Sequence, residues 1–414
     1  MRNVFDQYEQ IENRVTHALG TALHESHKFL EAFCRGVEHP LPLHAKVRVA
    51  IQHRPGVHAQ LSEEEALRRG LPDLWIDDGA DWALVIECKI QHSISLPQLR
   101  AHEREARQYE NSKVILISPE RAPESVSSVF KCILWTEVYE WAKALARDPW
   151  AEKLVSYLEV VEKKLVDEEK GLNGALTTFT GIPFSAEEPY SYMEAKRLLR
   201  LLMDGLRDRS DLHRVLGVNL RRKGRGSIKG KVSFSVWDML PLAGDDENFT
   251  RAPHLTVGIR STEAVAQLTI PDRVSQPTRR LLIGADVTDF EAGLNEFVRS
   301  VRRVLQRDSG AKPYVEVVQR HWPRGRAAPS TYDAEIVFDP RTIRGDGKII
   351  QQFEWIQAAF DAMQSRKANL QLAVGVRFPY ETSSVVGTST FADTVAEVFS
   401  ATSTFLSRVG RLPP

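Results

Sequence analysis

This sequence has no long apolar run and no pairing pattern among its cysteines, and its first residues do not have the pattern of a secretory signal. Each of these observations narrows the class of protein to expect. No stretch approaches the roughly 20 apolar residues that cross a bilayer, which argues against a membrane-spanning helix. The first residues, MRNVFDQYEQIENRV, are polar and acidic, whereas a secretory signal has a basic, an apolar and a small-residue zone. The chain has an odd number of cysteines, three, and none of them forms a Cys-x-x-Cys motif: Cys34, Cys88 and Cys132. Neither a disulfide framework nor a zinc site is therefore indicated. We therefore expect a cytoplasmic protein with reduced thiols and no membrane partner.

The chain also lacks an overall charge of either sign, because its formal net charge is zero. This total hides an asymmetry between its two parts. Residues 1–170 have 22 Lys and Arg against 28 Asp and Glu, a net charge of −6, and the remainder has 33 against 27, a net charge of +6. An acidic part beside a basic part suits a metal-holding catalytic module joined to a module that contacts a polyanion, although drift in composition can give the same totals.

The length of 414 residues is more than one hydrophobic core usually supports, so two domains are expected. In residues 171–188 the apolar periodicity stops and Gly, Thr and Pro gather, which indicates a linker. The sequence thus predicts an N-terminal domain of residues 1–170 and a C-terminal domain of residues 189–414.

The N-terminal domain has a pattern typical of an α/β fold. Ile11, Val15 and Leu19 recur at helical spacing, and short apolar runs punctuated by Gly, Asp and Pro predict strands. The expected elements are, in order, a helix from about residue 8, strands near 47–51, 73–76 and 83–87, a helix near 97–109, strands near 114–117 and 132–135, and helices from 136 and near 150–166.

The C-terminal domain is expected to be α+β. Helices are predicted near 191–216, 289–306, 350–364 and 391–408, and strands near 229–238, 254–260, 265–270, 314–320, 333–338 and 370–377. For the helix near 289–306, Thr288 and Glu291 have the spacing of a capping box.

Two neighbouring strands of the N-terminal domain carry the residues most informative about function. Asp73 follows Pro72 at the second strand, and Glu87-Cys88-Lys89 ends the third. The period of two in a strand places Glu87 and Lys89 on one face and Cys88 on the other. Other acid-x-Lys triplets lie in helix or loop patterns and begin at Glu162, Glu168, Glu194 and Asp346.

Phosphodiester cleavage needs side chains of these types. Two carboxylates at adjacent strand ends can hold a hard divalent cation such as Mg²⁺, for which Mn²⁺ is expected to substitute, and leave positions for water and a phosphate oxygen. Lys89 shares their face, so its ammonium can orient the nucleophile or offset charge that develops on the phosphate. The alternative interpretation is a solvated ion pair at the end of a strand.

The element order and the Pro-Asp and Glu-x-Lys motifs resemble those of the PD-(D/E)XK nuclease superfamily, the restriction-endonuclease-like fold, over roughly residues 5–145. The resemblance implies an αβββαβ core with a mixed sheet, in which Asp73 and Glu87 are metal ligands and Lys89 is the catalytic lysine. It implies that Glu12, in the first helix, is a further metal ligand. The run Gln98-Leu99-Arg100-Ala101-His102 resembles a downstream Gln-x-x-x-Tyr motif, which makes Gln98 a candidate active-site residue and leaves His102 where tyrosine is usual.

Glu12 and Gln98 each have a simpler interpretation. Glu12 flanks the apolar stripe of its helix and can be a surface charge. Gln98 lies at a helix start, where a role in capping or a position in solvent is nearly as common as a role in a site.

Basic segments of the C-terminal domain are candidates for contact with nucleic-acid phosphates. Segment 320–326 adds a tryptophan that can stack on a base. The other candidates are a glycine-interleaved run and a stripe on the 289–306 helix: Arg221, Arg222, Lys223, Arg225 and Lys229, and Arg299, Arg302 and Arg303. Charge runs are also common on solvated surfaces, and these segments contain no named DNA-binding motif.

The leading interpretation is a Mg²⁺-dependent nuclease with DNA as its expected substrate, and a role in restriction or phage defence is suggested by analogy alone. Two alternatives stay open: a catalytically inactive binding module of the same fold, and a nuclease gated by a partner or signal at the C-terminal domain. Cleavage of both strands would favour a homodimer, although no residue pattern establishes one. Alanine at Asp73, Glu87 or Lys89 is expected to abolish cleavage and leave the fold intact.

Overall fold

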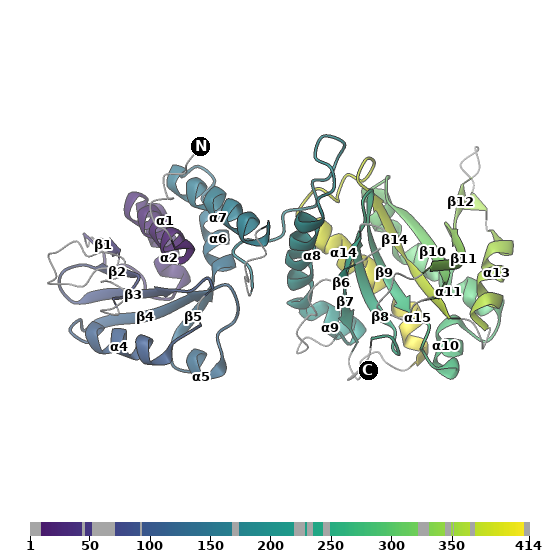
Figure 1. The fold of residues 1–414 in the computed structure, drawn as a ribbon, viewed down its shortest axis with the longest axis horizontal. Helices are drawn as coiled ribbons and strands as arrows, with labels where there is room; N and C mark the ends of the chain where they lie inside the picture. The colour runs from purple at the N-terminus through teal and green to yellow at the C-terminus, as the bar shows by residue number, and fades with distance from the viewer. Residues whose placement is uncertain are drawn as a thin grey trace. The chain divides into compact units, whose positions relative to one another are not determined.

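The protein divides into two compact units, Met1–Thr178 and Phe179–Pro414, and this division falls inside the segment 171–188. We describe each unit by itself (Figure 1). The computed structural model describes residues 10–43, 46–51, 71–91, 93–167, 174–218, 228–229, 235–242, 249–321, 331–343, 349–350, 352–364 and 369–409.

The first unit is built on a mixed sheet of five strands in the order β1-β2-β3-β4-β5. Strands β1, β2 and β3 are antiparallel neighbours, and β3, β4 and β5 are parallel neighbours. Their bounds are β1 Arg48–Ile51, β2 Leu74–Asp77, β3 Trp82–Cys88, β4 Asn111–Ser118 and β5 Lys131–Leu134. The mixed α/β character expected for this part of the chain is confirmed.

Helices cover both faces of this sheet (Figure 1). One face packs in an apolar core with α1 (Ile11–Glu25), α2 (His27–Gly36), α6 (Trp135–Lys143) and α7 (Pro149–Asp167). The other packs in a second core with α4 (Leu96–Ala106) and α5 (Glu124–Ser127). The sheet is therefore the middle layer of three, and its central strand β3 is buried along its whole length.

The side chains of β3 alternate between the two cores. Leu84, Ile86 and Cys88 belong to the core beside α1, whereas Ala83 and Val85 belong to the core beside α4. The same period directs Glu87 toward the α4 side and Cys88 away from it, as the sequence predicts. The strand thus places a carboxylate at the edge of an otherwise apolar layer.

Helix α2 has no counterpart among the expected elements. Ser26 has extended backbone between α1 and α2, and its Oγ accepts a hydrogen bond of 3.0 Å from Phe29 N. The side chains of Phe29, Leu30 and Phe33 are then buried by the new helix. A serine N-cap starts α2 within one residue of the end of α1, which leaves no loop to mark the change.

The second unit is built on an antiparallel sheet of seven strands in the order β11-β10-β14-β9-β8-β7-β6, with a separate pair, β12 and β13. These strands are β6 Ile228–Lys229, β7 Val236–Pro241, β8 His254–Ile259, β9 Glu263–Ile270, β10 Lys312–His321, β11 Thr331–Phe338, β12 Thr342–Ile343, β13 Ile349–Ile350 and β14 Leu370–Pro379. The helices are α8 Tyr192–Arg207, α9 Ser210–Leu216, α10 Gln276–Ile283, α11 Val287–Ser300, α12 Arg302–Arg307, α13 Phe353–Gln364, α14 Phe391–Ala401, α15 Ser403–Leu406 and the 3₁₀ helix η1 Ser407–Val409. Helix α8 contacts β7, α14 contacts β9 and α13 contacts β14, so helices pack against the sheet as an α+β fold requires.

Three of the four helices expected in this unit are broken into shorter ones, whereas the helix expected near 350–364 is the single helix α13. The helix expected near 289–306 is two helices, α11 and α12, and the proposed capping box of Thr288 and Glu291 is wrong. The N-cap of α11 is Asp286, whose Oδ1 accepts a hydrogen bond of 2.9 Å from Asp289 N. A carboxylate at this position satisfies an otherwise unpaired N–H and interacts favourably with the helix dipole, so the helix starts earlier than the apolar pattern suggests.

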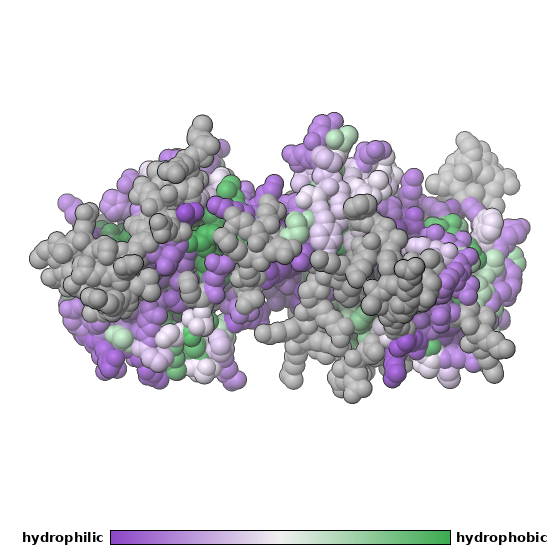
Figure 2. All heavy atoms as spheres, viewed as in Figure 1, coloured by the Kyte–Doolittle hydropathy of each residue, from purple (hydrophilic) through white to green (hydrophobic). Residues whose placement is uncertain are grey.

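The described residues on the face drawn in Figure 2 are largely hydrophilic. Figure 2 shows small, separate groups of hydrophobic residues on the face in view, between wider hydrophilic areas. Across the described part of the chain, no helix combines the length and the apolar character that a membrane span requires.

Candidate functional site

The pairing of β2 with β3 brings the two motif carboxylates together. These strands are antiparallel, and Leu74 pairs with Ile86, so the register continues to Asp73 opposite Glu87. Asp73 Oδ2 accepts a hydrogen bond of 2.7 Å from Cys88 N, which fixes the aspartate against the end of β3. Two side chains that are well separated in the sequence are therefore neighbours.

Glu87 is held through both of its carboxylate oxygens. Its Oε1 lies 2.7 Å from Lys89 Nζ, and its Oε2 lies 3.1 Å from His102 Nε2. Only 2% of Glu87 and 9% of Lys89 is exposed, so both groups are buried. Burial excludes the interpretation of Glu87 and Lys89 as a solvated surface pair.

Glu12 reaches the same cluster from the first turn of α1. Its Oε1 lies 3.4 Å from Lys89 Nζ, and its Oε2 accepts a hydrogen bond of 2.9 Å from Ile90 N. The backbone of Lys89 is itself fixed, because its N–H donates to Ile117 and its carbonyl accepts from Trp135 Nε1. Glu12 is therefore a component of the cluster rather than a charge on the outer surface of its helix.

The charges of this cluster perturb one another. Burial raises the pKa of Asp73 well above its usual range, and the nearby charge of Glu87 raises it further. Burial alone would lower the pKa of Lys89, but the charges of Glu87 and Glu12 outweigh it and the pKa is raised. Lys89 is thus held as an ammonium ion, while Asp73 and Glu87 repel each other when both are ionised.

The donor set suits a hard divalent cation. Among the residues that the structure describes, no group of three or more His, Cys, Asp or Glu side chains is already arranged to hold a metal ion. Glu12 and Glu87 instead both face the ammonium of Lys89. Asp73 and Glu87 offer oxygen ligands, and a cation between them would relieve the repulsion that raises the pKa of Asp73.

The downstream motif contacts the cluster through His102. Gln98 lies in the first turn of α4, where its backbone N–H donates to Ser95 Oγ at 3.4 Å as part of the helix cap. His102 lies one turn later, is fully buried and contacts Glu87. Its spacing of four residues from Gln98, on the helix that follows the motif strand, is the sequence signal that could have identified it.

The predicted basic segments of the second unit are described only in part. Arg221, Arg222, Lys223 and Arg225 lie outside the described residues, as does 322–326, and Lys229 is placed in β6 by its backbone alone. Arg299, Arg302 and Arg303 are exposed but lie on two helices, because α11 ends at Ser300. Arg299 also pairs with Glu296 at 2.6 Å.

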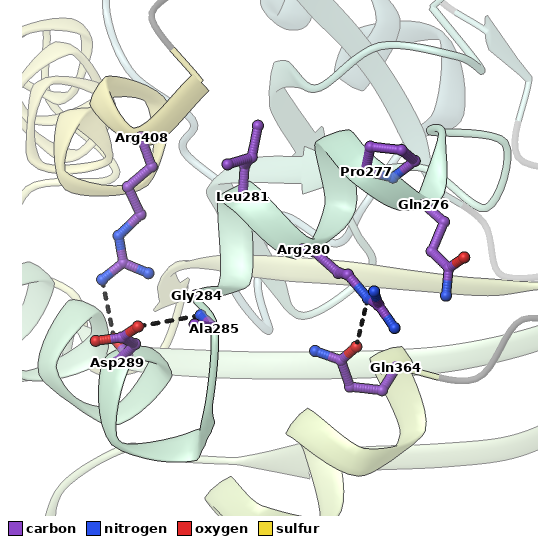
Figure 3. A pocket seen from close by; sticks show the side chains of 9 residues that line it. All are labelled: Gln276, Pro277, Arg280, Leu281, Gly284, Ala285, Asp289, Gln364 and Arg408. Carbon is purple, nitrogen blue, oxygen red and sulfur yellow. Dashed lines mark hydrogen bonds between the residues drawn. The ribbon is translucent and has the colours of Figure 1, made fainter.

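The second unit contains an open cavity of about 1020 Å³ beside α10, α11 and α13 (Figure 3). Its arginines already donate to the protein: Arg280 to Gln364 Oε1 at 3.3 Å, and Arg408 to the carbonyl of Asp289 at 2.9 Å. Asp289 accepts from Ala285 N in the same region. This cavity belongs to a different unit from the acidic cluster, and its polar groups serve to join its helices.

Comparisons with known proteins add no assignment to this geometry. No protein-family model matches the sequence, and no curated protein matches it at a significant level. The functional interpretation therefore depends on the chemistry of the described residues.

Proposed function

We propose that the first unit is a Mg²⁺-dependent nuclease of the PD-(D/E)XK type, which hydrolyses phosphodiester bonds of nucleic acid. One observation carries the proposal. Asp73, Glu87 and Lys89 meet at the ends of two paired strands, and Glu12 joins them from α1. The order of β1 to β5, with a helix before β1 and α4 between β3 and β4, supports a restriction-endonuclease-like core.

Asp73 and Glu87 are the residues that would hold the cation, with Glu12 as a further oxygen ligand at the edge of the cluster. When bound, the cation supplies Lewis acidity toward a phosphate oxygen and the attacking water. The charges of Glu87 and Glu12 raise the pKa of Lys89, so in the cation-free protein this residue is held as an ammonium ion rather than as a neutral base. Its ammonium instead faces the negative charge that develops on the phosphate oxygens as water attacks and the leaving oxygen departs.

The rival without catalysis, an inactive binding module, leaves the burial of this cluster unexplained. Like-charged carboxylates that share a site oppose folding, and proteins retain such strain mainly where a site uses it. Glu162, from one of the other acid-x-Lys triplets, offers a contrast in the same unit. Its carboxylate accepts hydrogen bonds from Leu176 N and Thr177 Oγ1, so its burial is explained by structure alone.

The second unit is proposed to contribute affinity for the polyanion, through exposed residues such as Arg302 and Arg303 and the positive net charge of this part of the chain. Gating of the nuclease by a partner or signal at this unit is the alternative. The choice of DNA over RNA and a role in restriction or phage defence depend on the resemblance alone. A homodimer is proposed only if both strands are cut, because double-strand cleavage needs two active sites.

The test is cleavage of plasmid DNA by the full chain in Mg²⁺, with and without chelator. We expect Asp73→Asn, Glu87→Gln and Lys89→Met each to slow cleavage by about a hundredfold or more, because each removes charge that acts on the reacting phosphate. Glu162→Gln is the matched control, since it changes a buried carboxylate of the same unit outside the cluster. A folded Glu87→Gln protein that cleaves at the wild-type rate would overturn the proposal.

A further inference from the structure

We propose that His102 is a positioning residue that holds the Glu87 carboxylate in its metal-binding orientation. The inference rests on the proposed function and extends it to α4, which lies across the sheet from Glu12 and α1. His102 is fully buried, and its Nε2 lies 3.1 Å from Glu87 Oε2.

The contacts of Glu87 come from two sides. Lys89 Nζ lies 2.7 Å from Oε1, and His102 lies beside Oε2. With one oxygen held, a carboxylate can still rotate about its last side-chain bond, whereas two contacts fix its plane. A cation coordinated by Oε1 would bind a carboxylate whose other oxygen is already fixed. The Glu87 side chain would then lose less conformational entropy on binding.

The tautomer follows from the surroundings of the imidazole ring. Nδ1 of His102 is buried and has no hydrogen-bond partner among the residues that the structure describes. A proton on Nδ1 would leave a buried donor unsatisfied, so the proton is assigned to Nε2, which donates to Glu87. His102 thus donates to the carboxylate through Nε2.

The position of His102 on α4 does not otherwise call for a polar residue. Leu99 and Ala106 precede and follow it at helical spacing, and both are buried in the apolar core beside the sheet. An apolar side chain would fill that place without the desolvation penalty that a buried imidazole carries. The contact with Glu87 is the described interaction that offsets this penalty.

The experiment compares His102→Met, which keeps the side-chain bulk but removes the donor, with His102→Gln, whose amide can still donate. Mn²⁺ binding is measured by calorimetry on the full chain without nucleic acid, and the Mg²⁺ dependence of plasmid cleavage is measured in parallel. We expect His102→Met to weaken Mn²⁺ binding and raise the half-saturating Mg²⁺ concentration about 10- to 100-fold, with a much smaller change in rate at saturating metal. His102→Gln should recover most of the affinity.

Leu99→Ala is the matched control, because it removes packing from the same face of α4. It should lower the stability of the first unit and leave Mn²⁺ affinity unchanged. Should His102→Met fail to fold, His102→Asn takes its place, since its shorter side chain draws the amide back from Glu87. Wild-type Mn²⁺ affinity in a folded His102→Met or His102→Asn protein, or an equal loss in Leu99→Ala, would overturn the inference. Absence of Mn²⁺ binding in the wild-type protein would instead overturn the metal site itself, and the role of His102 with it.

Discussion

The proposed divalent cation would bind carboxylates that Lys89 already contacts, so we expect Lys89→Met to destabilise the first unit most when no divalent cation is present. Lys89 Nζ lies 2.7 Å from Glu87 Oε1 and 3.4 Å from Glu12 Oε1. At an effective dielectric constant of about 20, these distances correspond to attractions of about 6 and about 5 kcal/mol. The desolvation of these charges, of which Glu87 and Lys89 are buried and Glu12 is half-buried, offsets much of that sum.

Removal of one partner from a buried ion pair destabilises proteins by about 3–5 kcal/mol, because the remaining charge is left buried and unpaired. We expect a loss of this size for Lys89→Met in the presence of chelator. Mg²⁺ should reduce the loss, since a cation bound by Asp73 and Glu87 neutralises the charge that Lys89 no longer offsets. At a cation concentration about 100 times its dissociation constant, binding stabilises the folded state by about 2.7 kcal/mol.

The assay is hydrogen exchange of the β3 amides, which reports on the first unit alone, in wild type and Lys89→Met, each with chelator and with Mg²⁺. Glu162→Gln serves as the control, because its destabilisation should not depend on Mg²⁺. A loss in Lys89→Met of the same size in chelator and in Mg²⁺ would refute the reasoning, since it would mean that cation and ammonium do not share these carboxylates.

Three further predictions concern other groups. Burial lowers the pKa of His254 to about 4. As the pH falls, this histidine is therefore protonated near pH 6.5 in the unfolded chain but only near pH 4 in the folded unit. The second unit should lose about 3 kcal/mol of stability as the pH falls from 7 to 4. Hydrogen exchange in β8 measures this loss, and an unchanged pH dependence in His254→Phe would contradict it. Because the pKa of Asp73 is raised, protons should compete with the cation at pH values above the titration range of an ordinary aspartate. The Mn²⁺ affinity measured by calorimetry should therefore fall on acidification. An affinity that stays constant down to about pH 4 would contradict this prediction. Alanine at the four basic residues in 221–225 should weaken the salt dependence of DNA binding. The slope of log affinity against log salt concentration should become less negative by about 0.9 for each phosphate that these residues neutralise in the wild-type protein. An unchanged slope would mean that this run is solvated surface.

The strands and the carboxylate pair were predictable because they follow from local patterns. Apolar runs broken by Gly, Asp and Pro marked β2 and β3, and the period of two placed Glu87 and Lys89 together. The approach of Glu12 to Lys89 could be expected only through the family resemblance, because nothing in the local pattern relates residues 77 positions apart.

Features that depend on tertiary packing were not predictable in the same way. His102 became part of the cluster because α4 packs on the Glu87 face of the sheet, and sequence alone left its role open. The burial of Glu87 and Lys89 also changes one expectation. Alanine at either position leaves a buried charge without its partner, so these substitutions should weaken the fold as well as the site, and Glu87→Gln is the sharper variant.

The central claim is that Asp73 and Glu87 hold the catalytic cation, and the most direct test is the anomalous scattering of Mn²⁺ in crystals of this protein. We expect a peak about 2.1 Å from a carboxylate oxygen of each residue, which disappears in Glu87→Gln and persists in Glu162→Gln. A Mn²⁺-soaked crystal with no peak between Asp73 and Glu87, in a protein that still cleaves DNA in Mn²⁺, would contradict it.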